Sequence, residues 1–110
     1  SVADQLAHWL ALPEPPTAVF CATDAIARSL VVAARERGLD VPRDLSVVGV
    51  DGDAGLSSVP VPVGEIGSRS VDALVRLLSG EPVADCRIAL PPGPLNGLLT
   101  VAPPLRSSGA

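Results

Sequence analysis

The chain has 110 residues, of which 47% are hydrophobic, and its formal net charge is −4 at neutral pH. This is enough for one small domain or for part of a larger one, and the apolar content excludes a disordered chain. The eight basic residues are all arginines and form no basic stripe, so the chain itself is a poor candidate for binding a nucleic-acid backbone. No apolar run approaches the roughly 18–20 residues of a membrane span, and no signal peptide is visible.

The first two predicted elements are a helix and a buried strand. Small and aliphatic residues recur at helical spacing over residues 2–11, and Pro13, Pro15 and Pro16 end that helix. A continuous apolar run at residues 17–22 follows. Because this run is short and bounded by proline and aspartate, it is typical of a strand buried on both faces of a parallel sheet.

A second helix and a second strand come next. Asp24 is predicted as the N-cap of a helix that reaches Arg37, and Gly38 as the residue that ends it. Another apolar run, residues 45–50, forms a strand that ends at a carboxylate, Asp51. Strand, helix and strand in this order indicate an α/β fold, a Rossmann-like parallel sheet with flanking helices.

The second half of the chain contains one clear helix and several short elements. Residues 57–59 are predicted as an edge strand at most, because prolines follow them closely. The clearest helix spans residues 65–79 and has an apolar face opposite a charged face. The remaining predicted elements are two short strands and a loose tail, at residues 88–90, 98–101 and 105–110.

Two carboxylates mark a candidate ligand site. Asp24 and Asp51 each follow a predicted parallel strand, and in open α/β sheets ligands bind outside the carboxyl ends of the strands. Asp24 has two compatible interpretations, a helix cap and an acceptor for ligand hydroxyl groups. Asp51 is either a ligand contact or a solvated loop acid. The sequence contains no glycine-rich phosphate loop, no metal-ligand spacing and no recognisable triad, so we expect no catalytic residues, no metal and no cofactor.

The two cysteines have no metal-binding spacing. Cys21 lies inside the first predicted strand and is expected to be a buried small hydrophobe. A disulfide between Cys21 and Cys86 stays open at this point, although a reducing cytoplasm fits the sequence better.

Three segments resemble a known family. TAVFCATDAIARSLVVAARERGLDVPRDLSVVGVDG, at residues 17–52, closely resembles the C-terminal part of LacI/GalR bacterial transcriptional regulators. LSSVPVPVGEIGSRSVDALVRLLSGEP, at residues 56–82, resembles the next segment and helix of that family, and PPGPLNGLLTVAPP, at residues 91–104, its closing strand. The resemblance covers roughly residues 1–104. It implies the C-terminal portion of an effector-binding domain with the type I periplasmic-binding-protein fold.

The resemblance also implies a function and a site. Such regulators are cytoplasmic, are not enzymes, form homodimers and bind a small sugar-like or nucleoside-like effector. They contact operator DNA through a helix-turn-helix domain, which is absent from this chain. Thr23 and Asp24 match the family's Asn-Asp pair at the cleft, and Asp51 matches the acid after the next strand, so these three are the predicted effector-binding residues. Thr23 replaces the usual asparagine, which removes a bidentate amide contact.

The absence of methionine leads us to expect a piece of a longer protein. In the family, the segment near residues 57–80 packs on a lobe that is missing from this chain, so the apolar face of its helix needs another partner. We predict self-association or a rearranged compact domain. Two alternatives remain open: a secreted sugar-binding protein of a transporter, and a truncated domain that associates without binding an effector. An α/β enzyme is disfavoured because no nucleophile and base are recognisable. The apolar face of the helix predicted at residues 65–79 comprises Val71, Leu74, Val75 and Leu78.

Overall fold

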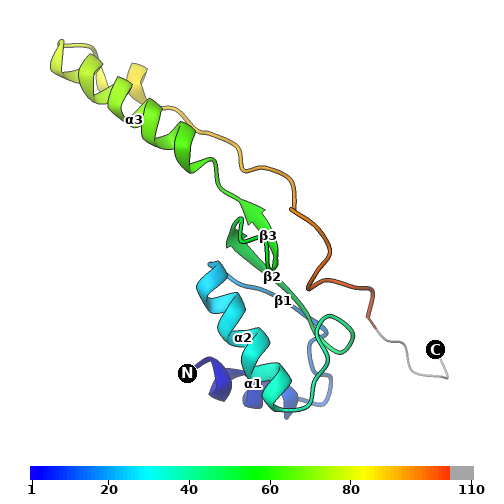
Figure 1. Ribbon diagram of the computed structural model, residues 1–110. Helices are drawn as coiled ribbons and strands as arrows, with labels where there is room; N and C mark the ends of the chain where they lie inside the picture. The colour runs from blue at the N-terminus through cyan, green and yellow to red at the C-terminus, as the bar shows by residue number, and fades with distance from the viewer. Residues whose placement is uncertain (105–110) are drawn as a thin grey trace. The chain divides into compact units, whose positions relative to one another are not determined.

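The computed structural model describes residues 1–104, so the predicted tail at residues 105–110 lies outside the described part of the chain. Two compact units are present. The first, here called the sheet unit, comprises residues 1–60 and the chain from residue 94 onward; the second, the helix unit, comprises residues 61–93. The elements, in chain order, are α1 (Val2–Leu10), β1 (Ala18–Phe20), α2 (Asp24–Glu36), β2 (Ser46–Asp51), β3 (Ser57–Pro60), α3 (Val63–Leu78) and a short 3₁₀ helix, η1 (Val83–Cys86) (Figure 1).

The sheet unit is built on three parallel strands in the order β1-β2-β3. Val19 pairs with Val47 across β1 and β2, and Val48 pairs with Ser57 across β2 and β3. Helix α2 makes the crossover between β1 and β2, as parallel pairing requires. The predicted α/β fold with a Rossmann-like parallel sheet is confirmed, and β3 is the edge strand that the sequence indicated.

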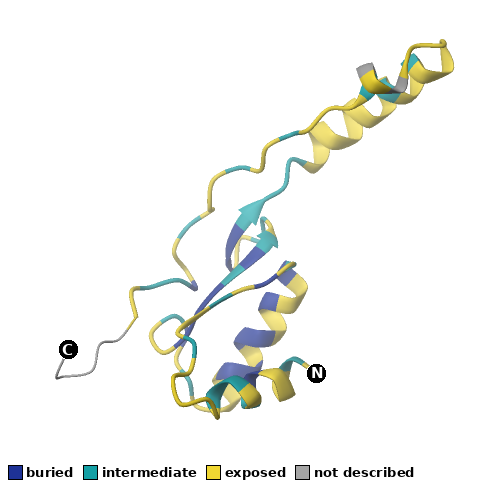
Figure 2. Ribbon diagram, turned by 180° about the vertical axis from the view of Figure 1, so that it is seen from behind, coloured by how far each residue is buried: buried dark blue, intermediate teal, exposed yellow. Residues whose placement is uncertain are grey.

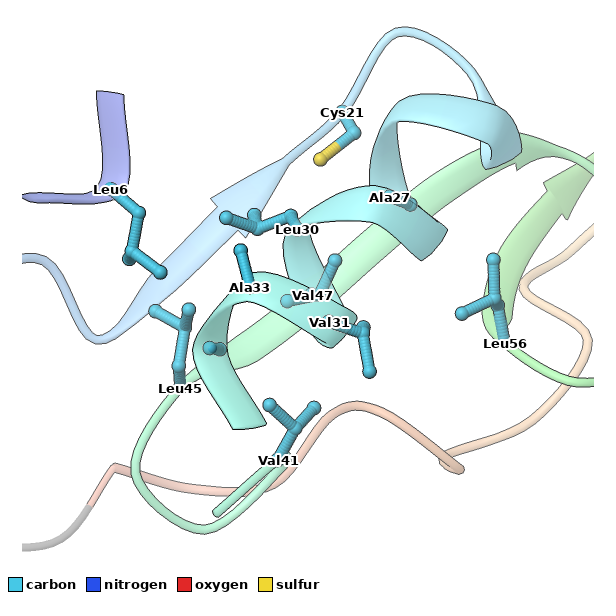
Figure 3. Packing of buried hydrophobic residues seen from close by; sticks show 11 residues of the cluster. Leu6, Cys21, Ala27, Leu30, Val31, Ala33, Val41, Leu45, Val47 and Leu56 are labelled. Carbon is cyan, nitrogen blue, oxygen red and sulfur yellow. The ribbon is translucent and has the colours of Figure 1, made fainter. Parts of the chain in front are cut away.

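The core of the sheet unit lies between α2 and the sheet (Figure 3). Leu30 and Val47 are buried in it, and Leu6 of α1 packs against the same cluster. Cys21 belongs to this cluster, as predicted, and burial raises the pKa of its thiol, so the thiol is a poor nucleophile at neutral pH. Both Cys21 and Cys86 are free thiols.

The prediction that Asp24 is the N-cap of α2 is wrong. Thr23 is the cap: its backbone is extended, and its Oγ1 accepts a hydrogen bond from the Ile26 N–H at 3.2 Å. Asp24 is the first helical residue, and its carboxylate has other partners. The prediction that Gly38 ends α2 is confirmed, because Gly38 has a φ of 78° and its N–H donates to the Arg35 carbonyl.

Three strand predictions also need correction. β1 is only three residues long and is not buried on both faces, since the Phe20 side chain is 68% exposed (Figure 2). Neither 88–90 nor 98–101 forms a strand in the described part of the chain. Thr100 still pairs with the sheet, because its carbonyl accepts the Val47 N–H at 2.7 Å. Ala102, two residues further on, bonds to the side chain of Ser46 and not to its backbone, so the segment does not extend the strand ladder.

The helix unit, residues 61–93, contains α3, η1 and the irregular segment that follows η1 as far as residue 93. Arg69 and Glu65 form an i,i+4 ion pair of 3.2 Å on α3, and the helix ends at Gly80, whose φ is 91°. α3 has no buried residue (Figure 2). Its predicted apolar face is exposed, up to 81% at Leu78. None of the described helices is long and apolar enough to cross a membrane.

Two adjacent valines of α2 provide a test of the core. Val31 is 5% exposed and Val32 is 51% exposed. Val31→Ala is expected to lower the free energy of unfolding by about 1.5–3 kcal/mol, because it removes two buried methyl groups and leaves a cavity. Val32→Ala is expected to change it by less than about 0.5 kcal/mol. Urea denaturation measures both, and equal effects at the two positions would contradict the packing of α2 described here.

Candidate functional site

The predicted site residues lie at the carboxyl end of the sheet. Thr23 and Asp24 follow β1 and begin α2, while Asp51 is the last residue of β2. The loop after Asp51 contacts Asp24 directly, since the Asp53 N–H donates to Asp24 Oδ2 at 2.7 Å. The structure therefore brings the segments that carry all three residues to one edge of the sheet, where open α/β folds bind their ligands.

Asp24 is a buried carboxylate with both oxygens engaged. It is 6% exposed, and its Oδ1 accepts a hydrogen bond of 2.7 Å from the hydroxyl of Ser58 while Oδ2 accepts the Asp53 N–H. Its position in the first turn of α2 places the negative charge near the positive end of the helix dipole. These partners offset the free-energy cost of burying a charge. Through its two hydrogen bonds, Asp24 connects α2 to β3 and to the loop after β2.

Gly49 makes the position of Asp24 sterically accessible. A Cβ atom built on Gly49 would lie 2.1 Å from Asp24 Oδ1 and 3.1 Å from the Cβ of Ala27. No side chain is tolerated at these separations without movement of the carboxylate or of α2. The glycine in the middle of β2 is therefore explained by the close approach of α2.

Asp51 has the opposite environment. Its side chain is exposed and makes no hydrogen bond or ion pair with the residues that the structure describes. Its backbone φ is 129°, which non-glycine residues rarely adopt, and such a conformation costs about 1–3 kcal/mol. Strain of this kind persists only where the surroundings enforce it, and it is concentrated at functional sites. Asp51 thus has a carboxylate without a partner among the described residues and an unfavourable backbone conformation, and it lies at the carboxyl end of the parallel sheet.

The connection between β2 and β3 explains that conformation. Only residues 52–56 join Asp51 to Ser57, yet Ser57 pairs with Val48, so the chain must double back sharply. Positive φ values at Asp51 and at Gly52, where φ is 93°, turn the chain. The Gly52 N–H then donates to Ser58 Oγ at 2.8 Å, which secures the turn against β3.

Thr23 is half-buried, and its hydroxyl oxygen already accepts the Ile26 N–H. The hydroxyl proton is left to donate to a second group. The described residues contain no group of three or more His, Cys, Asp or Glu that could hold a metal ion.

Three residues of the site escaped the sequence analysis: Ser58, Asp53 and Asn96. Ser58 is completely buried, and its hydroxyl bridges Gly52 and Asp24. A pair of serines in a short strand was a usable signal, because buried hydroxyl groups need hydrogen-bond partners. Asp53 lies at the rim, where it forms an ion pair with Arg28 of α2. Asn96 had no signal at all, since it lies in an irregular segment.

The chain is similar in sequence to proteins of known family. Residues 1–97 match the model of the periplasmic binding protein-like domain family. The chain is 35% identical over 94 residues to the HTH-type transcriptional repressor CytR of Escherichia coli (strain K12), which covers 74% of this chain and 28% of CytR. The chain belongs to the LacI/GalR family of regulators with a periplasmic-binding-protein-like domain. The resemblance seen in the sequence is confirmed.

Solved structures of the LacI family agree with the fold. A LacI family transcriptional regulator from Mycobacterium smegmatis superposes with a TM-score of 0.73 at 30% identity, over 94% of this chain and 40% of that protein. A LacI family regulator from Arthrobacter sp. FB24, solved in complex with lactose, superposes with a TM-score of 0.59 at 31% identity, over 72% of this chain and 30% of that protein. The chain spans less than a third of the length of the curated relatives it matches, such as 28% of CytR.

Gly49→Ala tests the close approach of α2 to β2. The added methyl group must displace the carboxylate of Asp24, and we expect a loss of about 1–3 kcal/mol in unfolding free energy. Gly67→Ala in α3 is the control: no atom lies within 4 Å of its added Cβ, and alanine favours the helix by about 0.5–1 kcal/mol. Urea denaturation followed by circular dichroism measures both variants.

The same experiment has an internal check. In the double variant Gly49→Ala/Asp24→Ala the new methyl group no longer meets a carboxylate, so its cost should fall below that of Gly49→Ala alone. Strictly additive effects would mean that the contact between Gly49 and Asp24 is not the reason for the glycine.

Proposed function

We propose that this chain is the effector-sensing part of a LacI-type transcriptional regulator that works in the cytoplasm and has no enzymatic activity. Its effector is a small sugar-like or nucleoside-like molecule. The membership in the LacI/GalR family supports the class of protein, and the lactose complex of the Arthrobacter relative supports a sugar as the first ligand to try. The observation that carries the proposal is the environment of Asp51: its backbone is strained, and its exposed carboxylate has no partner among the described residues.

The three predicted residues contribute in different ways. Asp51 accepts hydrogen bonds from ligand hydroxyl groups, for which a free carboxylate is well suited. Thr23 donates its remaining hydroxyl proton, although its oxygen also caps α2. Asp24 contacts a ligand only through lone pairs that its two present partners leave free, so its main contribution is to hold the loop that carries Asp51.

The regulatory mechanism is a shift between two conformations. An effector that binds one arrangement of the two lobes more tightly than the other moves the population toward that arrangement. In a homodimer this changes the spacing of the DNA-binding heads, and so the affinity for operator DNA, through a helix-turn-helix domain that lies outside this chain. The required coupling is a difference in effector affinity between the two states.

Two observations favour a second function, a domain that associates without binding an effector. The apolar face of α3 is exposed along its length, and both oxygens of Asp24 are already bonded within the chain. A protein with these features self-associates without needing an effector. Effector titration separates the two functions, because the association domain gives no heat of binding with any sugar or nucleoside.

Asp51→Ala tests the proposal in the natural full-length protein. The ligand is chosen as the sugar or nucleoside, beginning with lactose, that raises the melting temperature of the unmodified protein. We expect the variant to bind it about 10- to 100-fold more weakly, because hydrogen bonds to a charged group contribute about 1.5–3 kcal/mol. Isothermal titration calorimetry measures the dissociation constant.

Asp40→Ala is the matched control, since Asp40 is an exposed loop acid that precedes β2 and therefore lies away from its carboxyl end. Its affinity should equal that of the unmodified protein. Unchanged affinity in Asp51→Ala would refute the role of Asp51.

A further inference from the structure

Asn96 joins two parts of the candidate site through its side chain. It lies in the segment that follows the helix unit, residues 94–102, here called the return segment. Its Oδ1 accepts the Ser58 N–H at 2.7 Å, and its Nδ2 donates to the Asp53 carbonyl at 2.8 Å. Its backbone N–H also donates to the Ser58 carbonyl, at 3.0 Å. One residue thus binds both the outer edge of β3 and the loop after β2.

The orientation of the Asn96 amide follows from its partners. A backbone N–H can only donate and a backbone carbonyl can only accept, so the oxygen must face Ser58 and the nitrogen must face Asp53. A flipped amide would lose both hydrogen bonds. The two ends of this side chain therefore have separate roles, and each role can be removed by itself.

Asp53 is held from both sides. Its N–H donates to Asp24 Oδ2 at 2.7 Å, and its carbonyl accepts Asn96 Nδ2. Asp24 and Asn96 come from the two separate stretches of sequence that make up the sheet unit. The Asp53 carbonyl also accepts the Leu56 N–H at 3.2 Å, within the turn itself, so the loss of Asn96 loosens this carbonyl without leaving it unbonded.

We infer that Asn96 is a positioning residue of the effector site, which holds the Asp53 peptide so that Asp51 stays in its strained, ligand-ready conformation. This rests on the proposed role of Asp51. A loop that is already ordered loses less conformational entropy when a ligand binds, so the restraint raises affinity without a contact between Asn96 and the effector.

Asn96→Asp and Asn96→Ala separate the two roles of the side chain. The aspartate keeps an oxygen for the Ser58 N–H but replaces the donor to Asp53 with a second acceptor. Alanine removes both hydrogen bonds. Both variants are made in the natural full-length protein, with Leu99→Ala as the control, because Leu99 is an exposed residue of the same return segment.

Three measurements are made on each variant. Hydrogen exchange in the absence of ligand reports the amides of Gly52, Asp53 and Ser58, calorimetry reports the dissociation constant of the sugar or nucleoside selected for the Asp51→Ala test, with lactose tried first, and urea denaturation reports stability. In Asn96→Asp we expect faster exchange at Gly52 and Asp53 with Ser58 still protected, and ligand binding about three- to tenfold weaker. Asn96→Ala should weaken binding to the same extent and also release Ser58. The urea midpoint of Asn96→Asp should stay close to that of Leu99→Ala.

Three outcomes overturn the inference. The first is unchanged exchange at Gly52 and Asp53 in Asn96→Asp, and the second is weaker binding only in Asn96→Ala, which would assign the effect to the edge of β3. The third is a lower urea midpoint with uniformly faster exchange, which would make Asn96 a purely structural residue. Failure of the proposed function has a different signature: exchange responds to Asn96→Asp, but Asp51→Ala leaves ligand affinity unchanged.

Discussion

The buried carboxylate of Asp24 is the interaction on which the candidate site depends. It lies over Gly49 of β2, in the first turn of α2, and accepts hydrogen bonds from Ser58 and from the Asp53 N–H. A buried charge is costly unless hydrogen bonds and favourable dipoles surround it, and here both are present. The carboxylate therefore orders a helix terminus, an edge strand and a loop at once, which no apolar side chain could do at this position.

The two acids of the site show why similar residues in similar sequence positions have different roles. Each follows a parallel strand, so the sequence assigns both to the ligand-binding edge. Burial and bonding distinguish them: Asp24 is enclosed and fully engaged, whereas Asp51 is exposed and free. The strained backbone of Asp51 is maintained by the bonds that its neighbours Gly52 and Asp53 make with Ser58 and Asp24. The buried acid thus supports the exposed one.

Apolar surface remains on both units. Phe20 leaves one face of β1 exposed, and the apolar face of α3 from Val71 to Leu78 is exposed in the helix unit. Parallel sheets are normally covered on both faces. The region shared with this chain is 28% of the curated LacI/GalR relative CytR, and such exposed faces accord with residues that form one portion of a larger domain. Self-association of this chain stays a prediction.

The sequence by itself determined the order of the main elements. The apolar runs of β1 and β2, the helical period of α2 and α3, and the glycines at positions 38 and 80 are local signals, and each element lies within a few residues of its prediction. It also placed Asp51 at the carboxyl edge of the sheet, because strand direction alone decides which end of a parallel sheet a residue occupies.

Only the tertiary structure decided what the polar side chains bind. Thr23 rather than Asp24 is the helix cap, because the carboxylate has better partners in the loop after β2 and in β3, which lie 29 and 34 residues away in the sequence. Asn96 joined the site over 38 and 43 residues, from a segment with no periodicity of its own. Hydrogen bonds at such separations depend on where the folded chain places both partners, and neither hydrophobic period nor capping preference carries that information.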